Sequence, residues 1–289
     1  MKIVFLGTSG AENYPSLWCE CEYCKYARKH GGKNIRFSSS LHIEPDILID
    51  FPPTLHAQAL AYGVHLPHIK HMFFTHSHED HFYPSLIRWR YSKAYVKDTT
   101  DRYFSNKTPI PILSVYGTVP IIERIKKSFL YQEIEPYRIK FIPLMPYEKV
   151  LIDEKRSVIP VLGNHFLGDL YPFNFIFHIG DKNILYALDS DWPLPDTIAY
   201  IGYNKIKFDL VVVEATGGDL PREQVIKGHM NFEDNINLYH FFKEEGFLKK
   251  DAYFVLSHFT HYSPPYDMIV EKFEKIGITI SYDGMTLTL

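Results

Sequence analysis

The stretch Thr75-His76-Ser77-His78-Glu79-Asp80-His81 decides the fold of this 289-residue chain. It places three imidazoles and two carboxylates within six positions. The apolar run before it, residues 69–74, is predicted to be a buried strand that ends at Thr75. Open α/β sheets hold their sites at the C-terminal ends of their strands, so the stretch lies where a site is expected. Because imidazole and carboxylate are good ligands for zinc, manganese or iron, we predict a metal site here rather than a solvated polar loop.

Three later residues are candidates for further ligands. His165, Asp189 and His258 each follow an apolar run that is predicted to be a buried strand. Taken alone, His165 would more often be a polar residue whose hydrogen bonds are made by its neighbours. Asp189 alone would more often be a turn residue. Their ordered recurrence after strands favours ligands instead. Two metals ~3.5–4 Å apart would clamp a bridging hydroxide and oppose the charge that develops on a phosphoryl or acyl group.

The cysteines predict a second kind of metal site. All three of them, Cys19, Cys21 and Cys24, lie in one short segment. In a cytosolic chain, an odd and clustered set of cysteines favours metal binding over a disulfide. A closed structural zinc site needs four ligands, so a histidine must complete it. His261 is the best candidate because it lies three residues after His258. The alternatives are free thiols at the cysteines and an exposed or hydrogen-bonded role for His261.

Composition and charge restrict the possible partners. Hydrophobic residues make up 46% of the chain and charged residues 22%, which is ordinary for a globular protein. The formal net charge of −3 predicts no overall attraction to nucleic acid or to a membrane. No apolar run approaches the ~18 residues of a membrane span, and the apolar stretch at the N-terminus is too short for a signal peptide. We therefore expect a cytoplasmic protein, and a homodimer is left open.

The expected elements alternate between strands and helices. Helices are predicted over residues 54–62, 119–129 and 231–242, and strands over residues 2–6, 39–43, 47–50, 69–74, 112–116, 139–143, 155–161, 173–179, 183–188, 208–214, 252–257, 279–282 and 285–289. No Gly/Ser linker or repeat marks a boundary. The pattern fits one α/β domain over residues 1–289, an αββα sandwich of two β-halves. The cysteine loop at 19–24 and a Tyr- and Lys/Arg-bearing insertion at 91–109 would be additions to it.

The His-x-His-x-Asp-His motif is similar to the signature of the metallo-β-lactamase superfamily. That resemblance implies the metallo-β-lactamase αββα sandwich and a role for each candidate ligand. In the superfamily pattern one metal is held by His76, His78 and His165, the other by Asp80, His81 and His258, and Asp189 bridges the two.

A narrower resemblance adds the cysteine loop after residues 7–10, the pair His258 and His261, and the segments 86–89, 111–117 and 283–285. This combination resembles the PhnP-type cyclic phosphodiesterases, and PqqB-type proteins share the cysteine loop. The family hydrolyses five-membered cyclic phosphates of ribose and 2′,3′-cyclic nucleotides. The chain departs from the pattern at 91–109, which is longer, and at 214–218, which replaces a more usual Asp-containing strand end. Both segments are candidates for lining the substrate pocket.

The same resemblance predicts a proton donor at His229. A departing alkoxide needs a proton, and a positioned imidazole titrates near neutral pH. The alternative for His229 is an exposed residue at the start of a helix. Asp80 is predicted to be catalytic as well as a ligand. Asp50, at the end of its strand, is a candidate for orienting a ligand imidazole.

The function implied is that of a binuclear metal-dependent phosphodiesterase, a hydrolase in which a metal-bridging hydroxide attacks a small cyclic phosphate. The expected cofactors are two catalytic divalent metals, zinc or manganese, and one structural zinc. The expected partner is a small phosphodiester, and neither nucleic acid nor a membrane is expected. One alternative is a tRNA 3′-processing endoribonuclease, for whose RNA-gripping arm residues 91–109 are short. The other is a PqqB-like, non-hydrolytic protein of a cofactor pathway.

Overall fold

A computed structural model of the chain describes residues 1–90, 110–129, 137–165 and 172–289, so the predicted insertion at 91–109 lies outside it. The described residues form two sheets of seven strands each. The first sheet runs in the order β14 (Thr286–Thr288), β1 (Lys2–Gly7), β2 (Ser40–Ile43), β3 (Ile47–Ile49), β4 (His71–Phe73), β5 (Leu113–Gly117) and β6 (Ile139–Pro143). The second runs in the order β13 (Thr279–Ile280), β12 (Leu248–Ser257), β11 (Phe208–Glu214), β10 (Lys182–Ala187), β9 (Phe173–Ile179), β8 (Arg156–Leu162) and β7 (Val150–Leu151).

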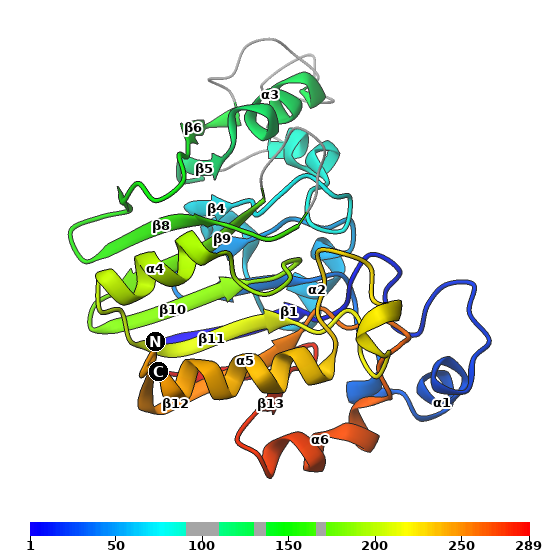
Figure 1. Ribbon diagram of the computed structural model, residues 1–289. Helices are drawn as coiled ribbons and strands as arrows, with labels where there is room; N and C mark the ends of the chain where they lie inside the picture. Colours follow the sequence, from blue (N-terminus) through cyan, green and yellow to red (C-terminus); the bar gives the residue numbers. More distant parts are fainter. Residues whose placement is uncertain (91–109, 130–136, 166–171) are drawn as a thin grey trace.

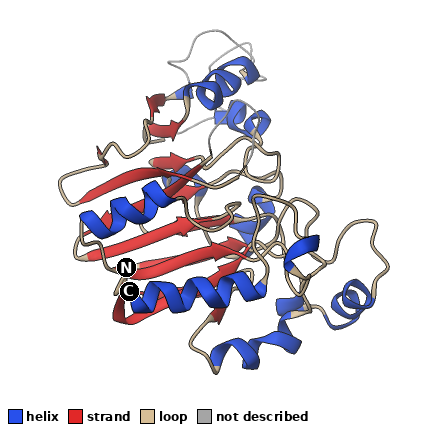
Figure 2. Cartoon of the chain, in the orientation of Figure 1, coloured by secondary structure: helices blue, strands red, loops and turns tan. Residues whose placement is uncertain are grey.

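All of the described α-helices except α1 (Glu22–His30) cover the outer faces of this sandwich (Figures 1 and 2). The covering helices are α2 (Leu55–Ala61), α3 (Val119–Ser128), α4 (Pro195–Tyr203), α5 (Phe232–Glu244) and α6 (Tyr266–Glu274). Figure 1 shows α4 and α5 along the second sheet, while α1 and the loop before it extend away from the sandwich. No helix among the described residues is both long and apolar enough to cross a membrane.

Three buried apolar clusters hold the layers together. One lies between the sheets and includes Phe73 of β4 and Tyr186 of β10. A second packs α4, α5 and α6 on the outer face of the second sheet, and a third packs α2 and α3 on the first sheet. Apolar clusters cover both faces of β11, so all seven residues of this strand are buried. The αββα sandwich expected from the sequence is therefore the observed arrangement.

Sheet topology places several strand ends at one edge of the sandwich. The strand β3 is parallel to β4, and β10, β11 and β12 are mutually parallel. Just after their strands, Asp50, Asp189 and His258 have φ values of 62°, 48° and 57°. This left-handed backbone is uncommon for residues other than glycine and is frequent where a site requires a particular side-chain direction. It turns the chain at the strand end and leaves these side chains at the shared edge.

Candidate metal centre

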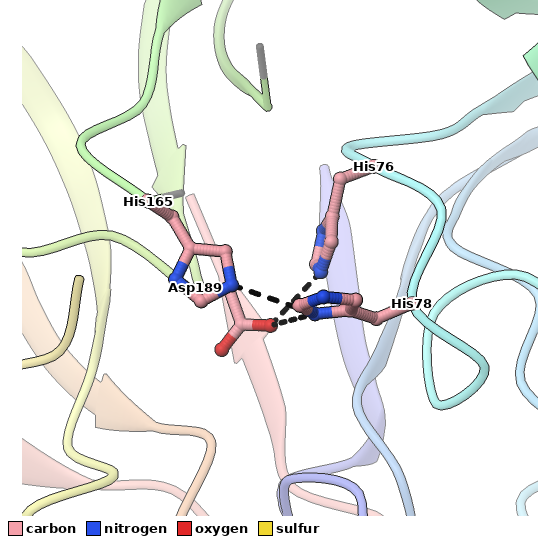
Figure 3. Close-up of side chains that lie close together, drawn as sticks. All are labelled: His76, His78, His165 and Asp189. Atoms are coloured by element: carbon pink, nitrogen blue, oxygen red, sulfur yellow. Dashed lines mark hydrogen bonds and ion pairs between the residues drawn. The ribbon is translucent and has the colours of Figure 1, made fainter. Parts of the chain in front are cut away.

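The first group of candidate ligands comes together as predicted. The nitrogen and oxygen atoms of His76, His78, His165 and Asp189 lie within 4.8 Å of one another (Figure 3). His76 Nε2 is 2.9 Å from Asp189 Oδ2, and His78 Nδ1 is 3.8 Å from the same oxygen. His165 Nε2 lies 3.4 Å from His78 Nδ1. Three ring nitrogens and one carboxylate therefore converge on one point, the donor set that a divalent transition metal favours.

The second group lies beside the first and shares Asp189 with it. Asp80, His81, Asp189 and His258 are all buried, with ligand atoms within 4.8 Å of one another. His81 Nε2 and His258 Nε2 are 3.0 Å apart, and both lie 3.3–3.4 Å from oxygens of Asp80 and Asp189. Because Asp189 belongs to both groups, its carboxylate has the place of a bridging ligand.

Neighbouring acceptors fix the orientation of four of the five imidazoles. The Nδ1 atom of His81 is 2.7 Å from Asp50 Oδ2, and that of His165 is 3.2 Å from Gly228 O. These acceptors require a proton on Nδ1, which leaves the Nε2 lone pair directed into the cluster. The Nδ1 atoms of His76 and His258 contact the hydroxyls of Thr75 at 3.0 Å and Thr216 at 2.9 Å. Hydrogen bonds of this kind orient histidine ligands in metalloproteins.

The hydroxyl partners are themselves directed away from the rings. Thr75 Oγ1 lies 3.0 and 2.9 Å from the two carboxylate oxygens of Asp50, and Thr216 Oγ1 lies 3.3 Å from His258 O. Each hydroxyl has one hydrogen, and donating it to these acceptors leaves an oxygen lone pair for the imidazole N–H. Asp50 thus supports both Thr75 and His81, as the prediction of an orienting role requires.

Buried atoms that lack a well-formed hydrogen bond indicate what the cluster would hold. Neither His76 Nε2 nor Asp189 Oδ1 makes a hydrogen bond of good geometry among the described residues, although both have ion-pair contacts within the cluster. Burial lowers the pKa of His76, and it lowers the pKa of His165 to about 4, so both rings are neutral ligands at pH 7. Burial alone would raise the pKa of Asp189, but the surrounding histidines outweigh it and hold this pKa well below its usual range. Neutral imidazoles around buried carboxylates fit divalent cations.

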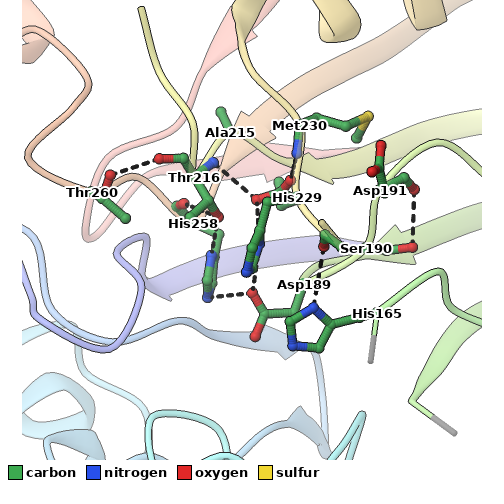
Figure 4. Close-up of polar contacts among 12 residues, drawn as sticks. His165, Asp189, Ser190, Asp191, Ala215, Thr216, His229, Met230, His258 and Thr260 are labelled. Carbon is green, nitrogen blue, oxygen red and sulfur yellow. Dashed lines mark hydrogen bonds and ion pairs between the residues drawn. The ribbon is translucent and has the colours of Figure 1, made fainter. Parts of the chain in front are cut away.

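His229 lies next to this cluster and is paired with a second buried acid. Its Nδ1 is 3.6 Å from Asp189 Oδ1 and 3.4 Å from Glu214 Oε2. Glu214 ends β11 and also accepts hydrogen bonds from the backbone N–H groups of Thr216 and Met230. Figure 4 labels these two donors together with His229 and Asp189. Burial lowers the pKa of His229, but the Glu214 and Asp189 carboxylates outweigh it and raise this pKa to about 9. The structure therefore places a largely buried imidazole, paired with two carboxylates, beside the candidate ligands, and not an exposed residue at a helix start.

The role of Glu214 was not predicted from the sequence. Residues 214–218 were expected to line a pocket, and a glutamate after three valines has the pattern of the last residue of a strand. The usable signal was a charged side chain that had to be buried, since an unpaired buried carboxylate is costly.

The cysteines gather, but His261 does not join them. The sulfur atoms of Cys19, Cys21 and Cys24 lie within 4.8 Å of one another. The backbone N–H groups of Cys21 and Cys24 donate to the sulfurs of Cys19 and Cys21 at 3.4 and 3.5 Å. Among the described residues no fourth ligand belongs to this group.

The ring of His261 has another partner instead. Its Nδ1 lies 2.9 Å from Glu12 Oε2, and its backbone N donates to the other oxygen of that carboxylate at 2.9 Å. The structure therefore shows three converging thiols. His261, the predicted fourth ligand, is hydrogen-bonded to Glu12 and lies outside this group.

Comparison with solved structures relates this geometry to known proteins. A diphosphatase of the PhnP family matches with a TM-score of 0.71 and 18% identity over 100% of this chain and 97% of that one. Zinc-bound PqqB from Methylobacterium extorquens matches with a TM-score of 0.73 and 17% identity over the full length of both chains. The short form of human tRNase Z matches with a TM-score of 0.65 and 19% identity over 100% and 99%.

No protein-family model and no curated protein sequence matches the chain. At these identities the structural matches show the fold alone: it is the metallo-β-lactamase fold, and it resembles the folds of the PhnP-family diphosphatase and of PqqB.

Proposed function

We propose that the chain is a binuclear metal-dependent hydrolase that cleaves small phosphodiesters, with cyclic phosphates as the substrate class. One observation carries the proposal: two candidate ligand groups share Asp189, and the imidazole of His229 lies 3.6 Å from that residue. This arrangement combines a binuclear centre with a proton donor on its rim. Hydrolysis of an ester with a poor leaving group needs both.

The seven ligands would hold two divalent cations, which when bound supply Lewis acidity and activate water. The protein residues have separate tasks. Asp50, Thr75 and Thr216 orient the ligand rings through their Nδ1 atoms. Glu214 holds the loop at Met230 and accepts from His229, and His229 delivers the proton to the departing oxygen. Asp80, which the sequence predicted to be catalytic, would contribute to the reaction as a buried metal ligand.

The three cysteines are proposed to bind one structural zinc. Burial raises the pKa of the Cys24 thiol to about 12, and a bound cation reverses such a preference. For His261 to be the fourth ligand, its Nε2 would have to come within reach of the three sulfurs, while Nδ1 could keep Glu12 as its hydrogen-bond partner. The natural substrate, a homodimer and a cytoplasmic location stay predictions.

A substrate panel with purified protein tests the proposed function. The wild type, loaded with Zn²⁺ or Mn²⁺, is compared with Asp189→Asn on a 2′,3′-cyclic nucleotide, a ribose cyclic phosphate, bis-nitrophenyl phosphate and a precursor tRNA. We expect turnover of the cyclic phosphates by the wild type only. Cleavage restricted to the precursor tRNA would favour the endoribonuclease alternative. Metal binding without turnover of any of the four would contradict a hydrolase and favour a PqqB-like role.

A further inference from the structure

One arginine fastens the loop that carries His229 to the loop that carries Asp189. Arg222 lies in the short 3-10 turn Arg222–Gln224, between β11 and α5. Its Nη2 donates to Asp191 Oδ2 at 2.5 Å, and its Nη1 donates to the backbone oxygen of His229 at 2.5 Å. The same Nη1 donates to Asp234 Oδ2 at 3.1 Å. A single guanidinium therefore joins three separate segments.

Two of the anchor points are themselves fixed near the metal centre. Asp191 comes two residues after Asp189, and its backbone N donates to the backbone oxygen of Asn164, the neighbour of His165, at 3.0 Å. Asp234 forms the capping box of α5 with Asn231, which lies two residues after His229. The contacts of Arg222 thus connect the loop of Asp189 with His229 and with the start of α5, and Asp191 extends the connection to the loop of His165.

The geometry of these contacts suits positioning more than ligand binding. The side chain of Arg222 is 43% exposed, whereas its carboxylate partners Asp191 and Asp234 are 15% and 22% exposed. Both terminal nitrogens already donate to protein acceptors, which leaves less of the guanidinium free for a phosphate. The planar fork of an arginine fixes direction as well as distance, which a lysine ammonium does not.

We propose that Arg222 is a positioning residue that holds the His229 imidazole beside Asp189 and so determines how effectively the protein protonates a leaving oxygen. This inference rests on the proposed function. Glu214 still holds Met230 and His229 when Arg222 is changed, so the loop is loosened rather than lost. A shift of a catalytic group by ~1 Å costs up to about 10²-fold in rate.

Arg222→Gln and Arg222→Lys test the inference, with Arg156→Gln as the matched control. Arg156 also pairs with two carboxylates, Asp46 at 2.5 Å and Asp153 at 2.6 Å, but it begins β8 at the end opposite His165. Metal content, kcat and KM are measured on a cyclic phosphodiester, which has an alkoxide leaving group, and on bis-nitrophenyl phosphate.

For Arg222→Gln we expect kcat on the cyclic substrate to fall by about 10–100-fold. The loss on the nitrophenyl ester should be much smaller, because that leaving group departs without a proton, while metal content and KM stay near wild type. Arg222→Lys should recover part of the loss. Arg156→Gln should keep the wild-type ratio of the two rates.

Hydrogen exchange provides a readout that does not depend on turnover. Amides of residues 225–231 should exchange faster in Arg222→Gln than in the wild type or in Arg156→Gln, because the loop loses its fastening. An unchanged ratio of the two rates overturns the proposal, and so does an equal loss on both substrates with a raised KM, which would make Arg222 a phosphate anchor. If the wild type hydrolyses neither substrate, the proposed function fails, and the exchange comparison alone decides whether Arg222 holds the loop.

Discussion

At the scale of single residues, the centre depends on which nitrogen of each imidazole carries a proton. The Nδ1 atoms of His81 and His165 face a carboxylate and a backbone oxygen, which keep the proton on Nδ1 whenever the ring is neutral. The partners Asp50 and Gly228 lie 31 and 63 positions away in the sequence. The ligand residues themselves are therefore recognisable from a motif, whereas the protonation that makes them ligands depends on the fold.

Replacing His229 should separate proton donation from metal binding. His229→Ala is expected to keep both catalytic metals, because His229 is not one of the seven ligands. Turnover of a cyclic phosphodiester should fall roughly 10²–10⁴-fold, the usual contribution of a positioned proton donor. Turnover of a nitrophenyl diester should fall much less. Steady-state kinetics and elemental analysis on the same preparations provide the measurement. An equal loss on the two esters would show that His229 acts through phosphate binding or metal placement.

Asp283 should make stability depend on pH. Its carboxylate accepts hydrogen bonds from Thr8 Oγ1 and from the backbone N of Phe37, both at 2.7 Å. Burial nevertheless raises its pKa from 3.8 to about 7. The folded chain then binds a proton that the unfolded chain has released. The stabilisation from this proton is complete below pH 3.8 and is lost as the pH rises through about 7.

Urea denaturation of the wild type and Asp283→Asn at pH 5 and pH 8 measures this effect. The free energy of unfolding of the wild type, relative to that of the variant, should be more favourable at pH 5. Taking the difference between the two proteins removes the contribution of the metal ligands, which both share. Parallel pH profiles would show that Asp283 stays ionised in the folded state.

At the scale of elements, the strands were easier to predict than the short helices. The bounds predicted for β6, β9 and β11 agree with the structure, and for β9 and β11 the reason is that buried strands read as nearly continuous apolar runs. The helices α1, α4 and α6 were not predicted. Each has nine residues, of which only two are buried. Helices of this length are stabilised mainly by tertiary packing, which a local pattern does not contain.

In the candidate site, too, features set by the local sequence were predicted and features set by tertiary contacts were missed. All seven candidate ligands come together, because each follows a strand and strand ends meet at one edge of a sheet; that they bind metal stays a prediction. The pairing of Glu214 with His229 was missed, since 15 residues separate the two. His261 was chosen for its nearness to His258 in the sequence. The turn between them directs His258 Nε2 toward Asp80 and brings His261 to Glu12 instead.

The cysteine loop should account for one zinc per chain. Cys21 caps the N-terminus of α1, and the three sulfurs converge in a segment that extends away from the sandwich, so a metal would fix a part of the chain that lacks a core of its own. Simultaneous replacement of Cys19, Cys21 and Cys24 by serine should reduce the metal content from about three ions to about two, with turnover partly retained. Elemental analysis of protein purified without chelator measures this.

Two single variants then examine the fourth ligand. If His261 completes the site, His261→Ala should weaken zinc retention, while Glu12→Gln, which keeps an acceptor for His261 Nδ1, should weaken it less. Unchanged zinc in the triple cysteine variant would contradict the structural site as a whole.

At the scale of the whole molecule, the metal centre connects the two sheets. His76, His78, Asp80 and His81 follow β4 of the first sheet, whereas His165, Asp189 and His258 follow β8, β10 and β12 of the second. Both proposed cations would be held by ligands from each side. The apolar cluster between the sheets also contacts both sheets. The two clusters on the outer faces contain none of the candidate ligands. Metals would therefore strengthen a sandwich that its apolar packing already forms.

Removing the metals should accordingly lower stability without unfolding the chain. A ligand present at 100 times its dissociation constant stabilises the folded state by ~2.7 kcal/mol, and in a protein of this size 1 kcal/mol moves Tm by roughly 2–4 °C. Chelation should therefore lower Tm by on the order of 5–10 °C and abolish turnover, while the far-UV circular dichroism spectrum keeps its shape. Asp189→Asn, which weakens both ligand groups at once, should reproduce the loss of turnover and respond less to chelator. If the spectrum collapses to that of an unfolded chain, the ligands and not the apolar clusters hold the sheets together. If Tm does not change, the two sheets are not joined through bound metal.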